Sequence, residues 1–326
     1  MSDRHGARRW DADLADLACP APLLQTWDWG EVQSREGWDV ERVALPGGGR
    51  ALVLLQGAGA LRRAYVPRGP VPATGPAIRE LAAWAHRRRL ALLRVEPEAP
   101  EAFGEELRRL GFRPAQASQP VHTLVVPLGS DEDMLAACKP KHRYNVRLAT
   151  KRGVTVAEES DAAELWRQSE GTARRQGIGQ LSEAQYRRRL ELLPSCRIYV
   201  ARHEGEALAA IMVASFAGRA YYLYGGAIGS KLQLMPAYAV QWAAMREAAK
   251  CGCRDYDLWG VPPDPGDTDH PWHGLWQFKS GFGGEPVRYC GAWELVLAPW
   301  AARVGAVAAG ARRTARRLRR WPLAQA

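Results

Sequence analysis

One lysine among aromatic residues is the feature of this sequence best suited to chemistry. Lys279 lies within Trp276-Gln-Phe-Lys-Ser-Gly-Phe-Gly-Gly284, directly after Phe278. The pattern predicts a short helix, a glycine turn and then an apolar strand. A helix that lines a cleft with Trp276 and Phe278 and adds one cation is suited to stabilising a developing oxyanion. Aromatic residues at this density are equally typical of a buried core, which is the alternative interpretation.

A second pattern lies at the end of a helix predicted over 162–176. Arg174-Arg-Gln-Gly-Ile-Gly179 fits the phosphate-binding loop of acyl-CoA-dependent GNAT transferases, in which backbone N–H groups and a helix dipole face a pyrophosphate. Such a loop follows a strand, whereas a helix precedes it here. An acyl-CoA-dependent transferase acting on an amine or a sugar is therefore the alternative function. The sequence contains no Gly-x-Ser-x-Gly elbow, so a covalent acyl-enzyme is not indicated.

Two residue pairs near the lysine could act as ligands. His270 and His273 are three residues apart, as in some metal sites, but only loop aspartates lie nearby to complete a site. A loop role is therefore favoured, and we predict no metal. Asp255 and Asp257 alternate on a predicted strand and so point to opposite faces of a sheet. One of them could orient a substrate amine, although a buried hydrogen-bonding role is favoured.

The positive charge is concentrated in two stretches. The chain has 326 residues and a formal net charge of +10; Lys139–Arg152 contains six Lys or Arg residues and Arg303–Arg320 contains seven, without any acid. Concentrated charge of one sign is typical of a surface that binds a polyanion. The alternative is two solvated helix faces. The sequence therefore predicts either a nucleic-acid or headgroup surface at these stretches or a plain solvated one.

Length and pattern predict two mixed α/β domains. The chain is long for one domain, and its 47% hydrophobic content is enough for real cores. Strand-like runs followed by helix–strand alternation indicate helices packed on a sheet. The second half repeats this rhythm, which suggests duplication. We expect domains over 1–145 and 146–298, with the boundary within 140–152, followed by a basic helix over 299–326.

Composition also indicates the compartment. The pair Cys251-Gly-Cys253 lacks the second pair that a zinc site needs. The first ten residues are charged, and no apolar run follows them, so we predict no secretory signal. No segment approaches the roughly 20 apolar residues that span a bilayer. We expect a cytoplasmic protein with reduced thiols.

These motifs together resemble the FemABX family, non-ribosomal peptidyltransferases that use aminoacyl-tRNA to add amino acids to peptidoglycan precursors. The central part of the resemblance lies within residues 255–297 and consists of Trp-Gly-Val, His-Pro-Trp, Leu-x-x-Phe-Lys-x-Gly-Phe-Gly-Gly and Gly-Ala-Trp-Glu-Leu. It extends to the Gln-Thr-Trp-Asp-Trp-Gly opening, the basic run that begins at Lys141, Tyr222-x-Tyr224-Gly-Gly and Thr172-Ala-Arg-Arg175-Gln-Gly.

The resemblance implies a fold and a reaction. Members have two tandem GNAT-like domains, with the C-terminal helix returning to the first. An amine of the precursor's stem peptide attacks the ester carbonyl of aminoacyl-tRNA, and the 3′-hydroxyl leaves. The ester is already activated, so positioning and oxyanion stabilisation suffice. By this analogy Phe278 and Lys279 are the catalytic residues, and no cofactor is expected beyond aminoacyl-tRNA as co-substrate.

The resemblance also implies binding residues and partners. Arg175 is expected to bind precursor phosphates, with Tyr224 and Trp276 as further substrate contacts. Family members often carry Lys where Gln33 stands here, and Arg35 is the candidate replacement. The acceptor is UDP-MurNAc-pentapeptide or lipid II, and we expect a monomer with peripheral contact at the inner leaflet of the membrane.

The basic stretches take on a specific role under this resemblance. Some members bind tRNA through a coiled-coil arm, and this chain has no heptad segment of that length. Its basic surfaces would then serve instead. The candidate tRNA contacts are Lys141, Arg143, Arg147, Lys151, Arg316 and Arg320. The non-enzymatic alternative is an RNA- or membrane-associated protein on a degenerate GNAT scaffold, which the intact Phe-Lys-x-Gly-Phe-Gly-Gly stretch disfavours.

Overall fold

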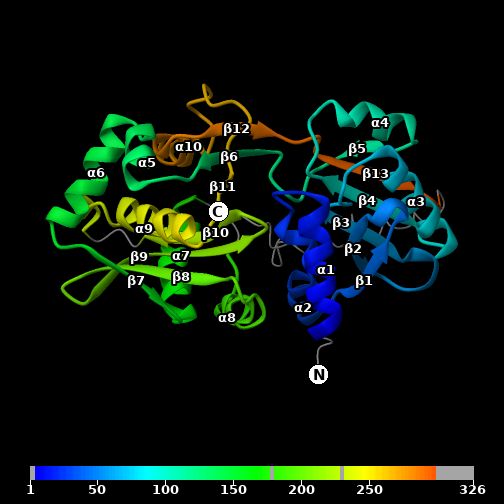
Figure 1. Cartoon of the computed structure of the whole chain (residues 1–326), viewed down its shortest axis with the longest axis horizontal. Helices are drawn as coiled ribbons and strands as arrows, with labels where there is room; N and C mark the ends of the chain where they lie inside the picture. The colour runs from blue at the N-terminus through cyan, green and yellow to red at the C-terminus, as the bar shows by residue number, and fades with distance from the viewer. Residues whose placement is uncertain (1–3, 177–179, 228–230, 299–326) are drawn as a thin grey trace. The chain divides into compact units, whose positions relative to one another are not determined.

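The chain folds into two compact units, each built around one sheet (Figure 1). The computed structural model describes residues 4–176, 180–227 and 231–298. The first unit contains the chain up to Val121 together with the segment that begins at Arg288, and the second contains His122–Val287. This division differs from the predicted boundaries at 145 and 298. The reason is strand pairing: β6 (His122–Pro127) joins the second sheet, and β13 (Ala292–Val296) joins the first.

The first unit consists of a six-stranded sheet and its covering helices. Its elements are α1 (Arg4–Leu17), η1 (Leu23–Gln25), α2 (Trp27–Arg35), β1 (Asp39–Ala44), η2 (Pro46–Gly48), β2 (Arg50–Gln56), η3 (Gly59–Leu61), β3 (Arg63–Arg68), α3 (Gly75–Arg87), β4 (Leu92–Pro97), α4 (Phe103–Arg109), β5 (Arg113–Ala115) and β13. The strand order is β1-β2-β3-β4-β13-β5, and within it β3 and β4 are parallel while the other neighbours are antiparallel.

Helix α3 shows how the sequence produces the first core. Thr74 caps the helix, since its hydroxyl accepts from Ala77 N at 3.3 Å. Ile78, Leu81 and Ala85 then recur at helical spacing and are fully buried. They pack with alternate residues of β2, β3 and β4 in one hydrophobic cluster. The connection from β3 through α3 to β4 is therefore a crossover between parallel strands.

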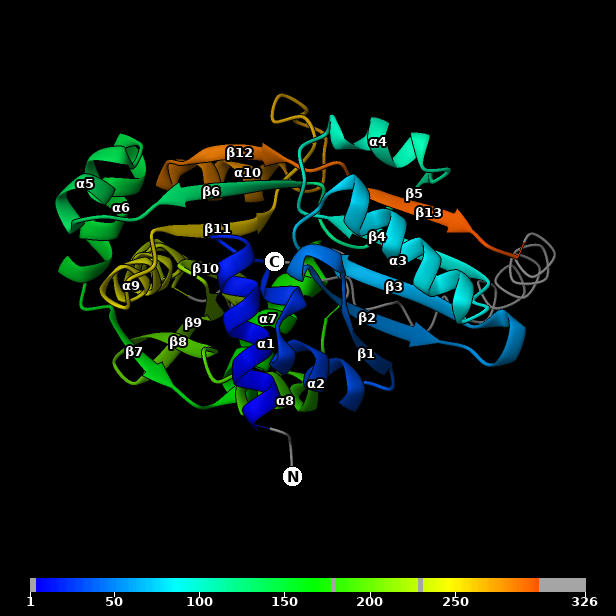
Figure 2. The same ribbon diagram turned by 45° about the vertical axis from the view of Figure 1, so that its right-hand side comes forward.

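The second unit has a seven-stranded sheet in the order β12-β6-β11-β10-β9-β8-β7. Its elements are β6, α5 (Asp131–Ala137), α6 (Pro140–Lys151), β7 (Thr155–Glu159), α7 (Ala162–Gln176), α8 (Glu183–Leu192), β8 (Arg197–His203), β9 (Glu206–Phe216), β10 (Arg219–Ala227), η4 (Leu232–Leu234), α9 (Pro236–Lys250), β11 (Asp255–Gly260), α10 (His273–Lys279), η5 (Ser280–Phe282) and β12 (Glu285–Arg288). Figure 2 shows β12, β6 and β11 side by side, with α10 beside them.

The second sheet is buried on both faces. Along β9, Ile211 and Val213 belong to the cluster formed with α9, while Met212 is equally buried on the opposite face. Helix α7 packs closely on β10: a Cβ added at Gly226 would lie 2.3 Å from the carbonyl oxygen of Gln168. Glycine is therefore required where this helix meets the sheet.

The two sheets repeat one topology, which supports the predicted duplication. Strands β1 to β4 with the α3 crossover correspond to β8 to β11 with the α9 crossover. In each sheet the next neighbour is antiparallel, namely β13 in the first and β6 in the second. Helix α4 follows β4 as α10 follows β11.

Most predicted elements of the second half match the structure, including the helices over 162–176 and 236–250. Helix α1 was not predicted, and the basic helix over 299–326 lies outside the described residues. Within the described part of the chain, no helix is long and apolar enough to span a bilayer.

Candidate active site

The parallel pair in the second unit ends early, and this creates the centre of the site. β10 and β11 pair at three positions, the last being Tyr221 with Asp257. The register of β11 against β6 then shifts between Asp257 and Gly260, and Trp259 adopts φ 62°. A left-handed conformation is strained for a bulky residue, typically by about 1–3 kcal/mol. Asp257 holds the bulge, because its carboxylate accepts from Trp259 N at 2.7 Å.

Lys279 places its amine between the two strands beyond that point. Nζ donates to the carbonyl oxygen of Gly260 at 2.8 Å and lies 5.4 Å from the centroid of the Tyr222 ring. The side chain is 0% exposed. Burial lowers the pKa of Lys279 to about 7, against a weaker opposing effect of Asp257. At neutral pH the amine is therefore divided between its charged and neutral forms.

The two predicted strand carboxylates lie in different surroundings. Asp257 is buried and also accepts from the Thr123 hydroxyl. Asp255 forms a two-point ion pair with Arg219, with Nη2–Oδ2 at 3.1 Å. Their opposite directions follow from the alternation of side chains along a strand. Of the two aspartates, only Asp257 is close enough to Lys279 to affect its pKa.

In helix α10, Lys279 is buried in the interior, whereas other residues of the helix line a groove. Lys279 is fully buried, whereas its neighbour Phe278 lies about 100° away around the helix and is less buried, as is Trp276. Both aromatic residues are half-buried and line an open groove of about 500 Å³. The groove is lined by Lys139, Lys141, His142, Tyr238, Pro265, His273, Gly274, Trp276, Gln277, Phe278 and Ser280. The predicted cleft on α10 is thus present, but Lys279 is fully buried and is not among the residues that line it, so its contact with an oxyanion stays a prediction.

Aromatic rings and cations meet in this groove. The Phe278 and Tyr238 rings are edge-to-face with centroids 5.2 Å apart. Lys139 and Lys141 are exposed at the start of α6. Lys139 Nζ donates to Ser280 Oγ at 3.0 Å, and its backbone N donates to Gly281 O at 2.9 Å, which holds α6 against η5.

His142 is a groove residue that the sequence analysis did not identify. Its Nε2 lies 2.8 Å from the carbonyl oxygen of Phe278, so Nε2 carries the proton and donates. The ring is 5% exposed and takes the place of a side chain at Gly281, where a Cβ would lie 1.9 Å from Cε1. Burial, with Lys139 and Lys141, lowers the pKa of His142. In the sequence this residue was hidden inside a basic run, and only its packing distinguishes it.

The predicted phosphate-binding motif meets the Tyr-Gly-Gly motif in space. Thr172 Oγ1 accepts from Ala227 N at 3.2 Å, which places the last turn of α7 beside the end of β10. Arg175 is in that turn, and its side chain lies outside the described part of the structure. Because α7 continues through Gln176, Arg174 and Arg175 are helical. An acyl-CoA loop would instead follow a strand, so the structure does not favour that alternative.

Tyr224 is buried and has protein partners. Its hydroxyl accepts from Arg189 Nε at 3.2 Å, and its ring is edge-to-face with Tyr186 at 5.3 Å. The predicted contact with substrate therefore stays a prediction, and the observed contacts are with α8.

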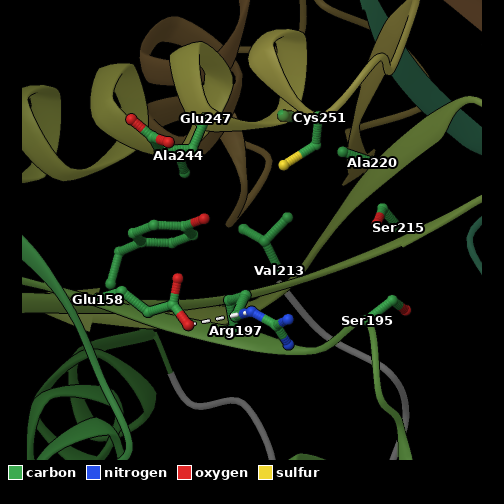
Figure 3. A pocket seen from close by; sticks show the side chains of 11 residues that line it. Glu158, Ser195, Arg197, Val213, Ser215, Ala220, Ala244, Glu247 and Cys251 are labelled. Carbon is green, nitrogen blue, oxygen red and sulfur yellow. Dashed lines mark ion pairs between the residues drawn. The ribbon is translucent and has the colours of Figure 1, made fainter.

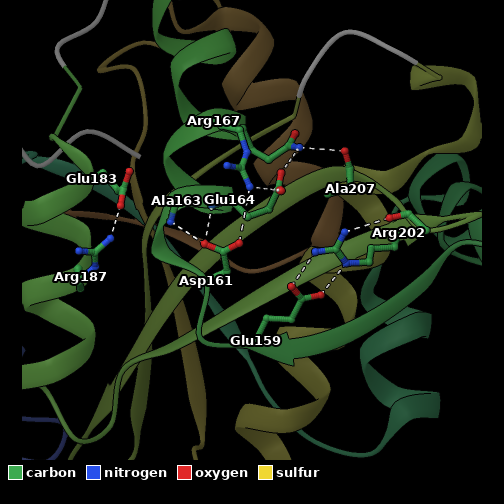
Figure 4. A network of polar contacts seen from close by, with 11 residues as sticks. Glu159, Asp161, Ala163, Glu164, Arg167, Glu183, Arg187, Arg202 and Ala207 are labelled. Carbon is green, nitrogen blue, oxygen red and sulfur yellow. Dashed lines mark hydrogen bonds and ion pairs between the residues drawn. The ribbon is translucent and has the colours of Figure 1, made fainter.

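A polar network fixes the start of α7 (Figure 4). Asp161 Oδ1 accepts from Ala163 N at 2.9 Å and Glu164 N at 3.1 Å, as a helix cap does. Arg202 and Glu159 form a two-point ion pair at 2.7 and 2.8 Å between β8 and β7. Gln168 Nε2 of α7 donates to the carbonyl oxygen of Ala207 in β9 at 2.9 Å, so the helix that carries Arg175 in its last turn is attached to the sheet nearer its start.

The remaining predicted residues differ in exposure. In α2 of the first unit Gln33 is buried, whereas Arg35 is exposed. In α6 Lys141, Arg147 and Lys151 are exposed. Arg143 is half-buried and donates to the carbonyl oxygens of Leu135 and Ala136 at 3.1 and 3.3 Å, at the end of α5. Arg316 and Arg320 lie outside the described residues.

A second cavity, of about 130 Å³, lies between α9 and the sheet (Figure 3). Glu158 and Arg197 form an ion pair at 3.0 Å on its wall, and the Cys251 thiol points into it. Burial raises the pKa of Tyr199 there to about 12. The lining contains none of the predicted site residues. Among the described residues, no group of three His, Cys, Asp or Glu side chains is arranged to hold a metal ion.

Comparisons with known proteins agree with the motifs. Residues 180–309 match the model of the FemAB family. Lipid II:glycine glycyltransferases of Staphylococcus aureus, from strains bovine RF122 / ET3-1 and USA300, are 22% identical over 376 aligned positions, which cover 84% of this chain and 88% of theirs.

The fold is shared with solved structures. A crystal structure of FemX has a TM-score of 0.81 at 19% identity and covers 91% of this chain and 98% of its own. A tandem GNAT protein from the clavulanic acid pathway has a TM-score of 0.53 at 14% identity and covers 90% and 96%. These likenesses confirm the predicted tandem GNAT-like fold. Residues 180–309, which include the Phe278-Lys279 stretch, thus match the FemAB family model, in agreement with the resemblance seen in the motifs.

Proposed function

We propose that the protein transfers an amino acid from aminoacyl-tRNA to the stem-peptide amine of a peptidoglycan precursor and so takes part in forming an interpeptide bridge. The observation that carries this proposal is the aromatic, cation-flanked groove on α10, built from the Phe278-Lys279 stretch of a FemAB-family domain. The names of the Staphylococcus aureus relatives support lipid II, a peptidoglycan precursor, as acceptor.

The groove suits the end of an RNA donor. Stacking on aromatic rings binds bases of any sequence, and lysines at the rim bind phosphates. Phe278, Trp276 and Tyr238 supply rings, while Lys139 and Lys141 supply charge. A volume of about 500 Å³ lies within the usual range of sites for ligands of this size. These features support tRNA as the carrier of the amino acid.

The reaction needs little from the protein beyond placement. The stem-peptide amine attacks the ester carbonyl carbon, the C–O bond to the 3′-oxygen breaks, and the amine proton ends on that oxygen. Charge develops on the carbonyl oxygen in between. We assign Lys279 to that charge: its amine is fully buried, directly after Phe278 in the sequence, where a low dielectric extends electrostatic reach. His142 is a positioning residue, since it holds the Phe278 carbonyl. No cofactor or metal is part of the proposal.

A transfer assay tests the proposal. Amino acids radiolabelled on a total aminoacyl-tRNA pool are offered with UDP-MurNAc-pentapeptide and, separately, with lipid II in vesicles. We expect label on one acceptor, lost after RNase treatment, and the labelled product identifies the amino acid. Preference for lipid II would place the reaction at the inner leaflet of the membrane. Absence of label on both acceptors, with tRNA shown to be charged, would overturn the proposal.

A further inference from the structure

An exposed tyrosine lies among the cations of α6. Tyr144 is 61% exposed, the largest exposed fraction among the large hydrophobic side chains of the described residues. Lys141, Arg147 and Lys151 are exposed at three-, three- and seven-residue offsets from it, so the four side chains follow one side of the helix. We call Lys141, Tyr144, Arg147 and Lys151 the α6 face.

The described part of the chain leaves the α6 face exposed. The opposite side of the helix is buried through His142, Asn145, Val146 and Ala149, which attach α6 to the second unit. Leaving a large ring in water forgoes about 1.5–3 kcal/mol that burial would contribute. The described fold therefore leaves this ring available to a partner.

The α6 face continues from the groove. Lys141 belongs to both, because it lines the groove and begins the face. From Lys141 to Lys151 the helix rises about 15 Å, since each residue adds 1.5 Å. A strand that leaves the groove at Lys141 can therefore pass Tyr144 and reach Lys151. Arg143 has no part in this, because it donates to the end of α5.

We infer that the α6 face binds the single-stranded 3′ end of the RNA whose terminal nucleotide occupies the groove, with a base stacked on Tyr144 and phosphates on Lys141, Arg147 and Lys151. The inference rests on the proposed function and specifies where its donor binds. Alternating cations and one aromatic ring are the usual elements of single-strand binding. A membrane-binding helix would instead insert an apolar face, and the apolar face of α6 is buried within the unit.

Direct binding of uncharged tRNA to the full chain tests this inference. The probe carries 2-aminopurine in its single-stranded 3′ end, and affinity is followed by fluorescence anisotropy. Tyr144→Ala is expected to weaken binding about tenfold, within the range for loss of one stacked base, and to abolish the 2-aminopurine quenching. Tyr144→Phe keeps a ring and should retain both.

The charge on the α6 face is tested separately through salt dependence. Arg147→Ala with Lys151→Ala should reduce the slope of log affinity against log salt by about 1.4, because each single-strand phosphate contact contributes about 0.7. Arg187→Ala with Lys250→Ala removes the same charge from exposed positions of the second unit and should leave the slope unchanged.

The outcomes separate this inference from the proposed function. Transfer from tRNA with unchanged affinity and quenching in Tyr144→Ala would overturn the α6 face and leave the function standing. If the α6 variants lose RNA binding but the wild-type protein shows no transfer activity, the α6 face is supported and the proposed function is overturned. If the α6 variants lose binding to vesicles with anionic lipids but keep RNA binding, the face is a membrane surface and the inference is wrong.

Discussion

Among the described residues, each unit contains one parallel strand pair, and the two pairs end differently. In the first unit β3 and β4 pair continuously from Arg63 to Arg68. In the second, β10 and β11 pair at three positions before both strands change register. The shared topology therefore ends the parallel pairing after three positions in one unit and continues it over six in the other. Two units of one topology can therefore differ at the ends of their parallel strands without a change in architecture.

A different buried cation lies near each of these strand ends. In the first unit Arg68 is buried at the end of β3, where it donates to Pro120 O at 2.8 Å and lies 3.6 Å from Glu98. The charge of Arg68 is therefore compensated by a carbonyl oxygen and a carboxylate. In the second unit Lys279 has one carbonyl oxygen and a desolvated amine. A cation that protein acceptors neutralise supports the fold, whereas a poorly solvated one is available to a developing negative charge.

The largest expected effect follows from this contrast. Lys279→Met should lower kcat for aminoacyl transfer about a hundredfold, the typical cost of losing one electrostatic donor. Arg68→Met, which removes the buried cation at the end of β3 in the first unit, should lower stability, with kcat per folded molecule little changed. Steady-state kinetics with folded fractions from circular dichroism measure both. Equal losses of kcat in the two variants would show that the two buried cations do not differ in role.

The next effect concerns the support beneath Phe278. His142→Phe fills the same space but removes the Nε2–H donor, so the buried Phe278 carbonyl loses its partner at about 1–3 kcal/mol in the free energy of unfolding. Because Phe278 lines the groove, kcat should fall more than tenfold without a comparable rise in KM for tRNA. His142→Gln retains an N–H donor and should restore part of kcat. A positioning role would be refuted if His142→Gln and His142→Phe had equal kcat.

The buried amine also predicts a pH dependence of stability. Its pKa is lowered in the folded chain, so between about 7 and 10.5 the unfolded chain binds more protons and stability rises with pH. The contribution is at most about 1.4 kcal/mol per pH unit. Urea unfolding at pH 6.5, 7.5 and 8.5 should therefore show a rise in the wild type that Lys279→Met lacks. Lys250→Met, at an exposed lysine of α9, should keep it. Parallel profiles for wild type and Lys279→Met would show that the amine is hydrated.

Local patterns predicted the elements and failed at long-range pairing. The helices over 162–176 and 236–250 follow from apolar spacing within each segment. The unit boundary does not, because β6 and β13 are short strands whose place is decided by which sheet they join. No spacing within His122–Pro127 states that its neighbours are β11 and β12.

The candidate site was predictable in composition more than in geometry. Phe278, Trp276 and Lys279 could be selected by type, but whether the amine faced a cleft depended on the bulge of β11, which shows in no motif. His142 required the packing over Gly281. Arg143 and Arg147 share a helix face by spacing, yet only one is occupied by a neighbouring helix end.

The smallest expected effect distinguishes Arg143 from Arg147 on α6. Arg143→Ala removes donors from the carbonyl oxygens of Leu135 and Ala136, and a cation at a helix C-terminus typically contributes about 0.3–1 kcal/mol. Unfolding of the second unit should shift by that amount, while the salt slope of RNA binding stays constant. Arg147→Ala should show the reverse, with unchanged stability and a slope lower by about 0.7. Urea unfolding and anisotropy on the same preparations measure both quantities. A guanidinium that is bound to the end of α5 cannot also neutralise a phosphate at full strength. A reduced salt slope for Arg143→Ala would therefore contradict this assignment and show that Arg143 contacts RNA.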